Sequence, residues 1–505
     1  MNQLKAGAAL NYVVIVLNIL VGLLYTPFLL RMLGQNDYGI YSLVASVISY
    51  LTVLDLGFGN AIIRYTAKFR AEGKVQEQYE LFGMFLIIYT VIGLVAMLLG
   101  FGLYTHADVW FGNTMTVEEL STTRIMLLLL IFNLAFTFPM SVFGAIILAY
   151  ERFVFPKVVN ILRILLNTGI MILLLEMGYR VIAMVVLQTV FNVFTLVCNY
   201  FYCKYKLRIK IWFRNFRWSF LKEVSTYSLW IFLSVIMDRI YWNTGQFVLA
   251  VYVNTAAVAV FAVAVQLGIL YMSFSTSISG VFLPKVTGMV ASNDNREEIS
   301  TLFIRTGRIQ YIVMALILSG FVVFGHDFIL LWAGEEYTDA YSIALLFFIA
   351  LTVPMIQNLG ITILQARNQM KFRALSYLVI GAVSLLLQLL LSKHYGALGC
   401  SWGIVGALLA GQGVVMNWYY HFRQGLDMVA FWKEIAKMSV VPFMMCLTAK
   451  LLLVHIPLDS WKSLGTAIVI YMAVYVPLFC RFGMNRYEYG LFMAPVRKFT
   501  NYLAR

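Results

Sequence analysis

Residues 8–30 read AALNYVVIVLNILVGLLYTPFLL, a continuous apolar run without a charged side chain. A helix needs about 20 such residues to cross the hydrocarbon core of a bilayer. The run is too long for the core of a signal peptide, and no A-x-A cleavage site follows it. We therefore expect it to form the first membrane-spanning helix.

Similar apolar runs recur along the whole chain. Of its 505 residues, 62% are hydrophobic and only 12% are charged, whereas about a quarter of a typical soluble domain is charged. The runs are continuous and do not alternate, which favours helices over barrel strands. The sequence predicts an all-α polytopic membrane protein with about fourteen transmembrane helices. The expected spans are 8–30, 38–60, 81–103, 125–149, 157–176, 180–202, 224–251, 254–280, 305–324, 340–364, 374–392, 396–420, 434–454 and 462–481.

Two neighbouring pairs of these runs are joined very tightly, at Glu176–Arg180 and at Val251–Asn254. If either pair were a single re-entrant segment, the number of spans would fall. Twelve spans is therefore the second choice.

The basic residues give the expected helices a direction across the membrane. With the N-terminus placed in the cytoplasm, cytoplasmic segments hold 29 Lys and Arg and outer segments hold five, namely Arg31, Arg124, Arg180, Lys393 and Lys462. Basic loops resist translocation, so this asymmetry predicts that both termini are cytoplasmic. It also accounts for most of the net charge of +14 without a nucleic-acid partner.

The loops and motifs argue against an enzyme. No loop is large enough for a separate soluble domain, and the chain has no phosphate-binding GxxxxGK[ST] loop, no H-E-x-x-H and no G-x-S-x-G in a suitable context. The five cysteines are scattered and match neither a disulfide framework nor metal-ligand spacing. We expect no catalytic residues, no metal and no cofactor.

An internal repeat divides the expected spans. Residues 147–160 (ILAYERFVFPKVVN) and 363–376 (ILQARNQMKFRALS) both end one span, make a short basic turn and begin another, at an offset of 216 residues. Residues 39–44 and 260–265 are related at a similar offset. Duplicated helix sets are typical of transporters. The repeat predicts a six-helix bundle at 1–202, a basic cytoplasmic linker at 203–222, a second six-helix bundle at 223–421, and two additional helices with a tail at 422–505.

Several motifs resemble one family of transporters. They are residues 25–41 (YTPFLLRMLGQNDYGIY), 54–65 (LDLGFGNAIIRY), 150–153 (YERF) and 394–403 (HYGALGCSWG). They resemble the Wzx-type polysaccharide transporters of the MOP superfamily, whose other branches include MATE drug exporters and lipid II flippases. The resemblance spans nearly the whole chain.

This resemblance implies a fold and a function. The fold is two six-helix bundles around a central cavity, with the last two helices outside the core. The function is translocation of an undecaprenyl-pyrophosphate-linked oligosaccharide from the cytoplasmic to the outer leaflet by alternating access. It further implies a bacterial plasma membrane location and a polysaccharide polymerase or chain-length machinery as partners. Coupling to a Na⁺ or H⁺ gradient is a separate hypothesis, which Asp238 and Asp55 motivate.

Polar residues inside spans are the candidates for transport chemistry, because a charge at mid-bilayer costs at least about 2.5–3.5 kcal/mol. Arg163 lies between Asn160 and Asn167 at helical spacing, so the three form a polar stripe on one face of the fifth span. We expect this stripe to line a cavity and Arg163 to contact the diphosphate. Asn18 is a further headgroup candidate.

Two other positions are candidates for the same chemistry. Asp238 and Arg239 lie in the middle of the seventh span, where Arg239 would hold diphosphate and Asp238 a coupling cation. Asp55 and Arg64 flank a glycine-rich break near the inner end of the second span, as a second ion-coupling and a second headgroup candidate. The alternative for each pair is a structural role. Most other intramembrane amides are expected to form interhelical hydrogen bonds. These are Asn133, Asn243, Gln246, Gln266, Gln357, Asn358 and Gln388.

Two other functions remain open from the sequence. A MATE-like antiporter for drugs or metabolites would have the same fold, although an intramembrane arginine suits cationic substrates poorly. A membrane-embedded glycosyltransferase or polymerase is disfavoured because its outer loops are usually larger. The sequence does not identify the sugar, the coupling ion, the oligomeric state or the type of surface polysaccharide.

Overall fold

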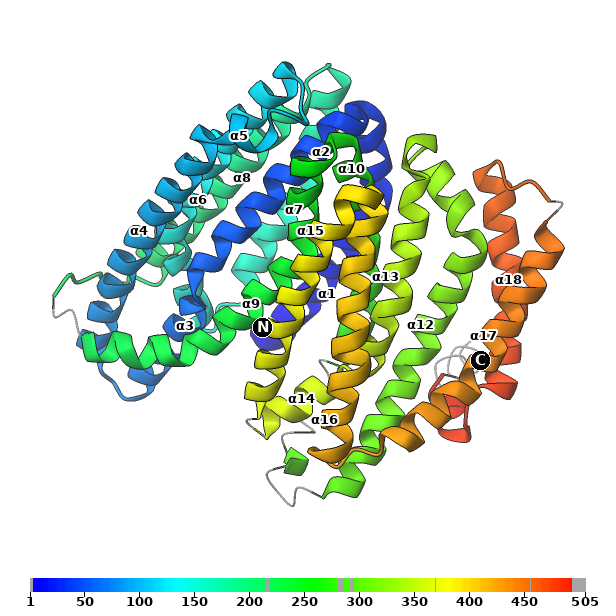
Figure 1. Cartoon of the computed structure of the whole chain (residues 1–505). Helices are drawn as coiled ribbons and strands as arrows, with labels where there is room; N and C mark the ends of the chain where they lie inside the picture. Colours follow the sequence, from blue (N-terminus) through cyan, green and yellow to red (C-terminus); the bar gives the residue numbers. More distant parts are fainter. Residues whose placement is uncertain are drawn as a thin grey trace, which may run out of the picture. The chain divides into compact units, whose positions relative to one another are not determined.

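The apolar runs form helices, and in the part of the chain that the structure describes every regular element is helical. The computed structural model (Figure 1) describes residues 3–214, 218–279, 286, 288–290, 295–367, 369–454 and 456–492. Within them, eleven helices are long and apolar enough to cross a membrane. The chain is an all-α polytopic membrane protein.

The chain divides into two units, which are described separately. Unit 1 comprises Met1–Ala262 and Gln388–Cys400, and unit 2 comprises Val263–Leu387 and Ser401–Arg505. The helices of unit 1 are α1 (Gln3–Leu20), η1 (Val21–Tyr25), α2 (Thr26–Leu51), η2 (Thr52–Asp55), α3 (Phe58–Ala71), α4 (Val75–Thr105), α5 (Ala107–Phe111), α6 (Val117–Ala149), α7 (Val154–Glu176), α8 (Val181–Phe201), η3 (Tyr202–Lys206) and α9 (Trp218–Tyr252).

The core of unit 1 forms where α4 packs along α6 and α6 packs along α8 (Figure 1). Phe82, Phe85 and Phe138 are among its buried members. Small residues let the helices approach closely, since a Cβ added at Gly100 of α4 would lie 2.5 Å from Cγ1 of Ile131 on α6. This packing fixes the positions of the polar residues on neighbouring helices.

Unit 2 is built around the long helix α12, which packs against α13, α17 and α18. Two helices, α10 (Thr255–Ser279) and α15 (Met370–Leu408), carry residues of both units. The other helices of unit 2 are α12 (Arg296–Trp332), η5 (Glu335–Tyr337), α13 (Asp339–Ile356), α14 (Leu359–Ala366), η6 (Leu409–Val415), α16 (Met416–Phe422), α17 (Met428–Leu453) and α18 (Trp461–Phe482).

The expected spans correspond closely to these helices. Two of the eleven apolar helical stretches, Ala9–Ala71 and Met370–Phe422, each contain two expected spans. Each stretch is kinked at a glycine with a positive φ, Gly34 (78°) in the first and Gly396 (56°) in the second. Glycine adopts positive φ values readily. The expected span 224–251 corresponds to α9. The total of fourteen spans stays a prediction.

The two tight junctions each connect separate long helices. Helix α7 ends at Glu176 and α8 begins at Val181, with a turn at Gly178 (φ 88°). Helix α9 ends at Tyr252 and α10 begins at Thr255. All four helices have at least 21 residues, so each is long enough to span the membrane by itself.

The turns of the predicted repeat lie at matching places. The first quoted stretch contains the turn from α6 to α7, and the second contains the turn from α14 to α15. Each following span then ends in a turn with a left-handed glycine, Gly178 or Gly396. The division into two six-helix bundles stays a prediction. Residues 215–217 of the predicted linker and the tail after residue 492 lie outside the described residues.

Candidate functional site

The first turns of α7 are held against α1. The backbone N–H of Val154 donates to Oε1 of Gln3 at 3.3 Å, and Nζ of Lys157 donates to Oδ1 of Asn11 at 2.6 Å. The two helices therefore run side by side from the same end of unit 1. This contact places the polar residues of α1 beside those of α7.

Arg163 lies nine residues into α7, which is roughly 14 Å along the helix axis at about 1.5 Å per residue. Its side chain is partly buried. Within the described residues, no carboxylate or carbonyl accepts a hydrogen bond from its guanidinium. An arginine has five N–H donors, so this cation is left with all its hydrogen-bonding capacity available to a ligand.

The side-chain amides on either side of Arg163 likewise form no hydrogen bond with other described residues. Asn160 and Asn167 lie one turn before and one turn after it, on the same face of α7. Oδ1 of Asn167 is buried and has no hydrogen-bond partner in the described part of the chain. All three residues lie on helix α7, and a cavity-lining role for this stripe stays a prediction.

Asn18 on α1 lies at the same depth as Arg163. Asn11 meets Lys157, and Asn18 lies two turns further along the same face of α1. At equal rise per residue, Asn18 is level with residue 164 of α7. Its side chain is exposed. We call Asn18, Asn160, Arg163 and Asn167 the α1–α7 polar stripe.

The second pair of candidates lies on α9. The hydroxyl of Tyr50 on α2 donates to the backbone carbonyl of Arg239 at 3.2 Å and also bonds Thr244. Nε of Arg239 is buried and lacks a hydrogen-bond partner among the described residues. The neighbouring Asp238 has an exposed side chain. These contacts join α2 to α9 through the backbone of Arg239 and leave its guanidinium Nε uncommitted.

Asp55 lies at the break between α2 and α3. Leu56 (φ 53°) and Gly57 (φ 75°) are both left-handed here, so the chain changes direction immediately after the aspartate. The hydroxyl of Tyr89 on α4 donates to Oδ1 of Asp55 at 2.5 Å. This bond connects the break to α4. Arg64, one of the headgroup candidates, is exposed and lies near the ring of Tyr65 on α3.

Some of the other intramembrane amides form the expected interhelical bonds. Nδ2 of Asn192 on α8 donates to Oδ1 of Asn133 on α6 at 2.5 Å, and Nδ2 of Asn133 donates to Thr189 on α8 at 3.2 Å. In unit 2, Nε2 of Gln357 donates to Oδ1 of Asn417 at 3.0 Å. The prediction of a structural role is confirmed for Asn133 and Gln357.

The sequence did not predict a buried charge cluster in unit 2. Arg308 on α12 donates through Nε and Nη2 to the two carboxylate oxygens of Glu488, at 2.6 and 2.8 Å. Its Nη1 donates to Glu434 on α17 at 2.6 Å. The signal in the sequence is Glu434 and Glu488, two acids near or within basic segments that are predicted to be cytoplasmic. The cluster fastens the segment after α18 to α12 and is structural.

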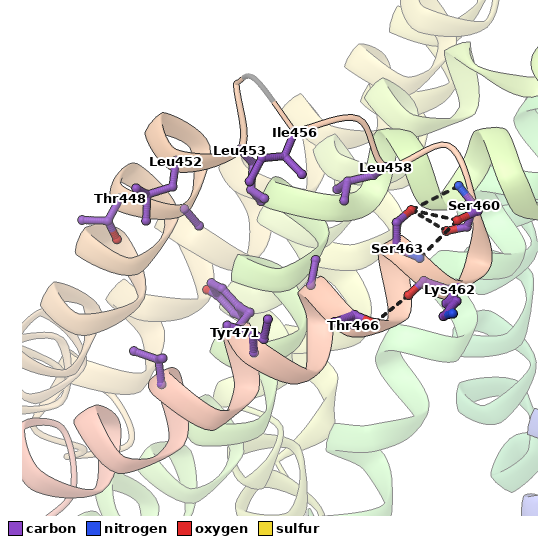
Figure 2. A pocket seen from close by; sticks show the side chains of 14 residues that line it. Thr448, Leu452, Leu453, Ile456, Leu458, Ser460, Lys462, Ser463, Thr466 and Tyr471 are labelled. Atoms are coloured by element: carbon purple, nitrogen blue, oxygen red, sulfur yellow. Dashed lines mark hydrogen bonds between the residues drawn. The ribbon is translucent and has the colours of Figure 1, made fainter.

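An apolar groove of about 650 Å³ lies between α17 and α18 (Figure 2). Leu452, Leu453 and Ile470 are among its lining side chains. Polar groups gather near the start of α18, where Ser460 and Ser463 form a capping box and Lys462 lies between them. Most of the lining of this groove is apolar.

Comparison with known sequences finds a matching family model and a curated relative. Residues 4–290 match a family model described as "Polysaccharide biosynthesis protein". The chain is 22% identical over 468 residues to a curated protein of Bacillus subtilis (strain 168), "Uncharacterized membrane protein EpsK", with 90% of each chain covered.

Two solved structures have the same fold. The lipid II flippase MurJ in an inward closed conformation superposes with a TM-score of 0.72 at 14% identity, covering 94% of this chain and 98% of that one. An inward-facing multidrug transporter of the MATE family of the MOP superfamily gives 0.65 at 16% identity, covering 82% and 99%. These similar structures are transporters and not enzymes.

Proposed function

Because the chain belongs to the polysaccharide biosynthesis protein family, we propose that it is a flippase for a lipid-linked oligosaccharide. Its cargo would be an undecaprenyl-pyrophosphate-linked glycan, moved from the cytoplasmic to the outer leaflet for a cell-surface polysaccharide such as O-antigen, capsule or exopolysaccharide. The family and the MurJ-like fold support this class of substrate.

The observation that carries the proposal is Arg163, whose guanidinium forms no hydrogen bond with another described residue. An unpaired cation at this depth costs several kcal/mol unless an anion or water compensates it. A diphosphate supplies that anion and accepts charge-assisted hydrogen bonds from a guanidinium. The amides of Asn18, Asn160 and Asn167 add donors and acceptors that match sugar hydroxyls. The α1–α7 polar stripe thus suits a headgroup that is both anionic and hydroxylated.

The mechanism that we propose is alternating access. The diphosphate and sugars would travel along polar side chains while the polyprenyl chain stays in lipid, so the headgroup never enters hydrocarbon unsolvated. Arg163, Arg239 and Arg64 would hold the diphosphate at successive stages. Asp238 or Asp55 would bind the coupling Na⁺ or H⁺. The protein would act in the bacterial plasma membrane with both termini in the cytoplasm, beside a polysaccharide polymerase or chain-length machinery.

A flipping assay in proteoliposomes tests this proposal. Purified protein is reconstituted with the host's own lipid-linked oligosaccharide, and outward exposure of the glycan is measured. Loss of a charged hydrogen bond is worth about 1.5–3 kcal/mol, so Arg163→Ala should slow flipping at least about tenfold. The matched control is Lys450→Ala, which removes an exposed cation near the end of α17. Wild-type protein that flips no glycan would refute the proposed function.

The alternative is a MATE-like antiporter, which the similarity to a MATE transporter favours. It predicts efflux of cationic dyes that depends on Na⁺ or H⁺. An uncommitted arginine in the polar stripe repels such substrates, and this is why we place the flippase first. Gradient-dependent dye efflux by the same proteoliposomes, without glycan flipping, would favour the antiporter.

A further inference from the structure

Unit 1 contains a cavity of about 810 Å³ that is separate from the α1–α7 polar stripe. It is lined by the first part of α8, by the turn that precedes it, and by single turns of α2, α6 and α7. The predicted orientation places this end of unit 1 at the outer surface of the membrane. We name it the α8 cavity.

One part of the α8 cavity is apolar and exposed. Leu174, Val186 and Val190 line it, and the side chains of Val186 and Val190 are 42% and 56% exposed. From Val181 to Val190 the chain rises roughly 14 Å at about 1.5 Å per residue. This distance is close to the hydrocarbon thickness of one leaflet, which is half of the ~30 Å core.

The other part of the cavity carries charges of both signs. Arg180 has a side chain that is 70% exposed, and its Nη1 lies 3.5 Å from Oδ2 of Asp37. Glu118 is exposed and forms no hydrogen bond or ion pair within the described residues. The adjacent Glu119 is already committed, because its carboxylate accepts from Thr116 and Thr255 at 2.8 Å. Two carboxylates and one guanidinium therefore remain at the mouth.

We propose that the α8 cavity binds one phospholipid of the outer leaflet that has a primary ammonium headgroup, such as phosphatidylethanolamine. The acyl chain would lie along Val186 and Val190, and the phosphate would accept hydrogen bonds from Arg180. The ammonium would donate to Glu118 and Asp37. The exposed ring of Tyr179 lies at the same mouth, as is usual for aromatic residues at the membrane interface.

The arrangement of charges selects this lipid class. A phosphatidylglycerol has a phosphate for Arg180 but leaves two carboxylates facing an anion. A phosphatidylcholine carries a cation that has no N–H group to donate. Phosphatidylethanolamine supplies both the phosphate and the N–H donors. This inference does not depend on the glycan substrate, because the cavity shares no residue with the polar stripe.

Native mass spectrometry of the purified full chain tests the inference. The protein is mixed with equal amounts of phosphatidylethanolamine, phosphatidylcholine and phosphatidylglycerol, and the bound lipids are counted. We expect a preference of about threefold or more for phosphatidylethanolamine, the size that one or two partly exposed ion pairs give. Arg180→Ala and Glu118→Gln should each remove most of this preference.

The matched control is Arg124→Ala. Arg124 is also an arginine at this end of unit 1 and is paired with Asp108, but it does not line the cavity. It should leave the preference unchanged. A second variant, Val190→Trp, fills the apolar part without touching the charges and should lower binding of all three lipids. Equal binding of the three lipids, a preference for phosphatidylglycerol, or the same loss in Arg124→Ala would each overturn the inference.

Discussion

Three ionisable residues of unit 1 that lie in expected membrane spans differ in the hydrogen bonds that they form. Asp55 accepts a hydrogen bond from Tyr89 and lies at the break between α2 and α3. Nε of Arg239 is buried without a hydrogen-bond partner in the described part of the chain, and the partly buried guanidinium of Arg163 forms no hydrogen bond with another described residue. A side chain that already forms hydrogen bonds within the protein is less available to a substrate. By this criterion Arg163 ranks first among the proposed headgroup ligands.

Exposure separates the two proposed ion-coupling residues, since Asp238 is exposed and Asp55 is partly buried. We expect Asp238→Asn to abolish transport in proteoliposomes while folded protein is recovered in normal amounts, because Asp238 is exposed and changes charge without losing packing. Asp55→Asn is the matched control, since it makes the same chemical change at a carboxylate that is hydrogen-bonded to Tyr89. That variant should mainly lower the thermal unfolding temperature. Full gradient-driven transport by Asp238→Asn would remove this residue from the coupling role.

At the scale of elements, helix α12 is longer than its apolar run. The sequence predicts a span at 305–324, whereas the helix extends from Arg296 to Trp332. Arg308 lies in the N-terminal half of this helix, and its guanidinium contacts both oxygens of Glu488 and one of Glu434. Hydropathy alone cannot predict such contacts, because the partners lie 180 and 126 residues away in the sequence.

This cluster makes a prediction about stability. The side chains of Arg308 and Glu488 are 6% and 1% exposed, and breaking a buried ion pair by removing one partner costs about 3–5 kcal/mol. Glu488→Ala should therefore lower the thermal unfolding temperature of the purified protein by several degrees. Glu434→Ala is the matched control, because the side chain of Glu434 is 34% exposed and such pairs contribute at most about 1 kcal/mol. Equal shifts in both variants would show that burial does not set the strength of the cluster.

For the whole molecule, the sequence predicts the helical class and most helix positions, because continuous apolar runs leave helices as the favoured structure in lipid. The polar stripe at Asn160, Arg163 and Asn167 also follows from helical spacing. What the sequence does not provide is the partner of each polar group. Asp55 and Tyr89, or Arg308 and Glu488, come together only through packing of helices distant in the chain, and no local pattern encodes these pairs.

The orientation of the whole chain is the remaining prediction, and it rests on the distribution of Lys and Arg. Labelling of single cysteines in right-side-out vesicles, in a background without the five native cysteines, tests it. Val117→Cys and Met177→Cys should react with a membrane-impermeant maleimide, because both positions are more than 70% exposed and lie in predicted outer turns. The matched positions Lys74→Cys and Phe213→Cys lie in exposed, predicted cytoplasmic segments and should react only after the membrane is permeabilised. The reverse labelling pattern would show that the topology is opposite to the predicted one. It would also place the α8 cavity in the cytoplasmic leaflet, so this labelling decides which leaflet supplies its lipid.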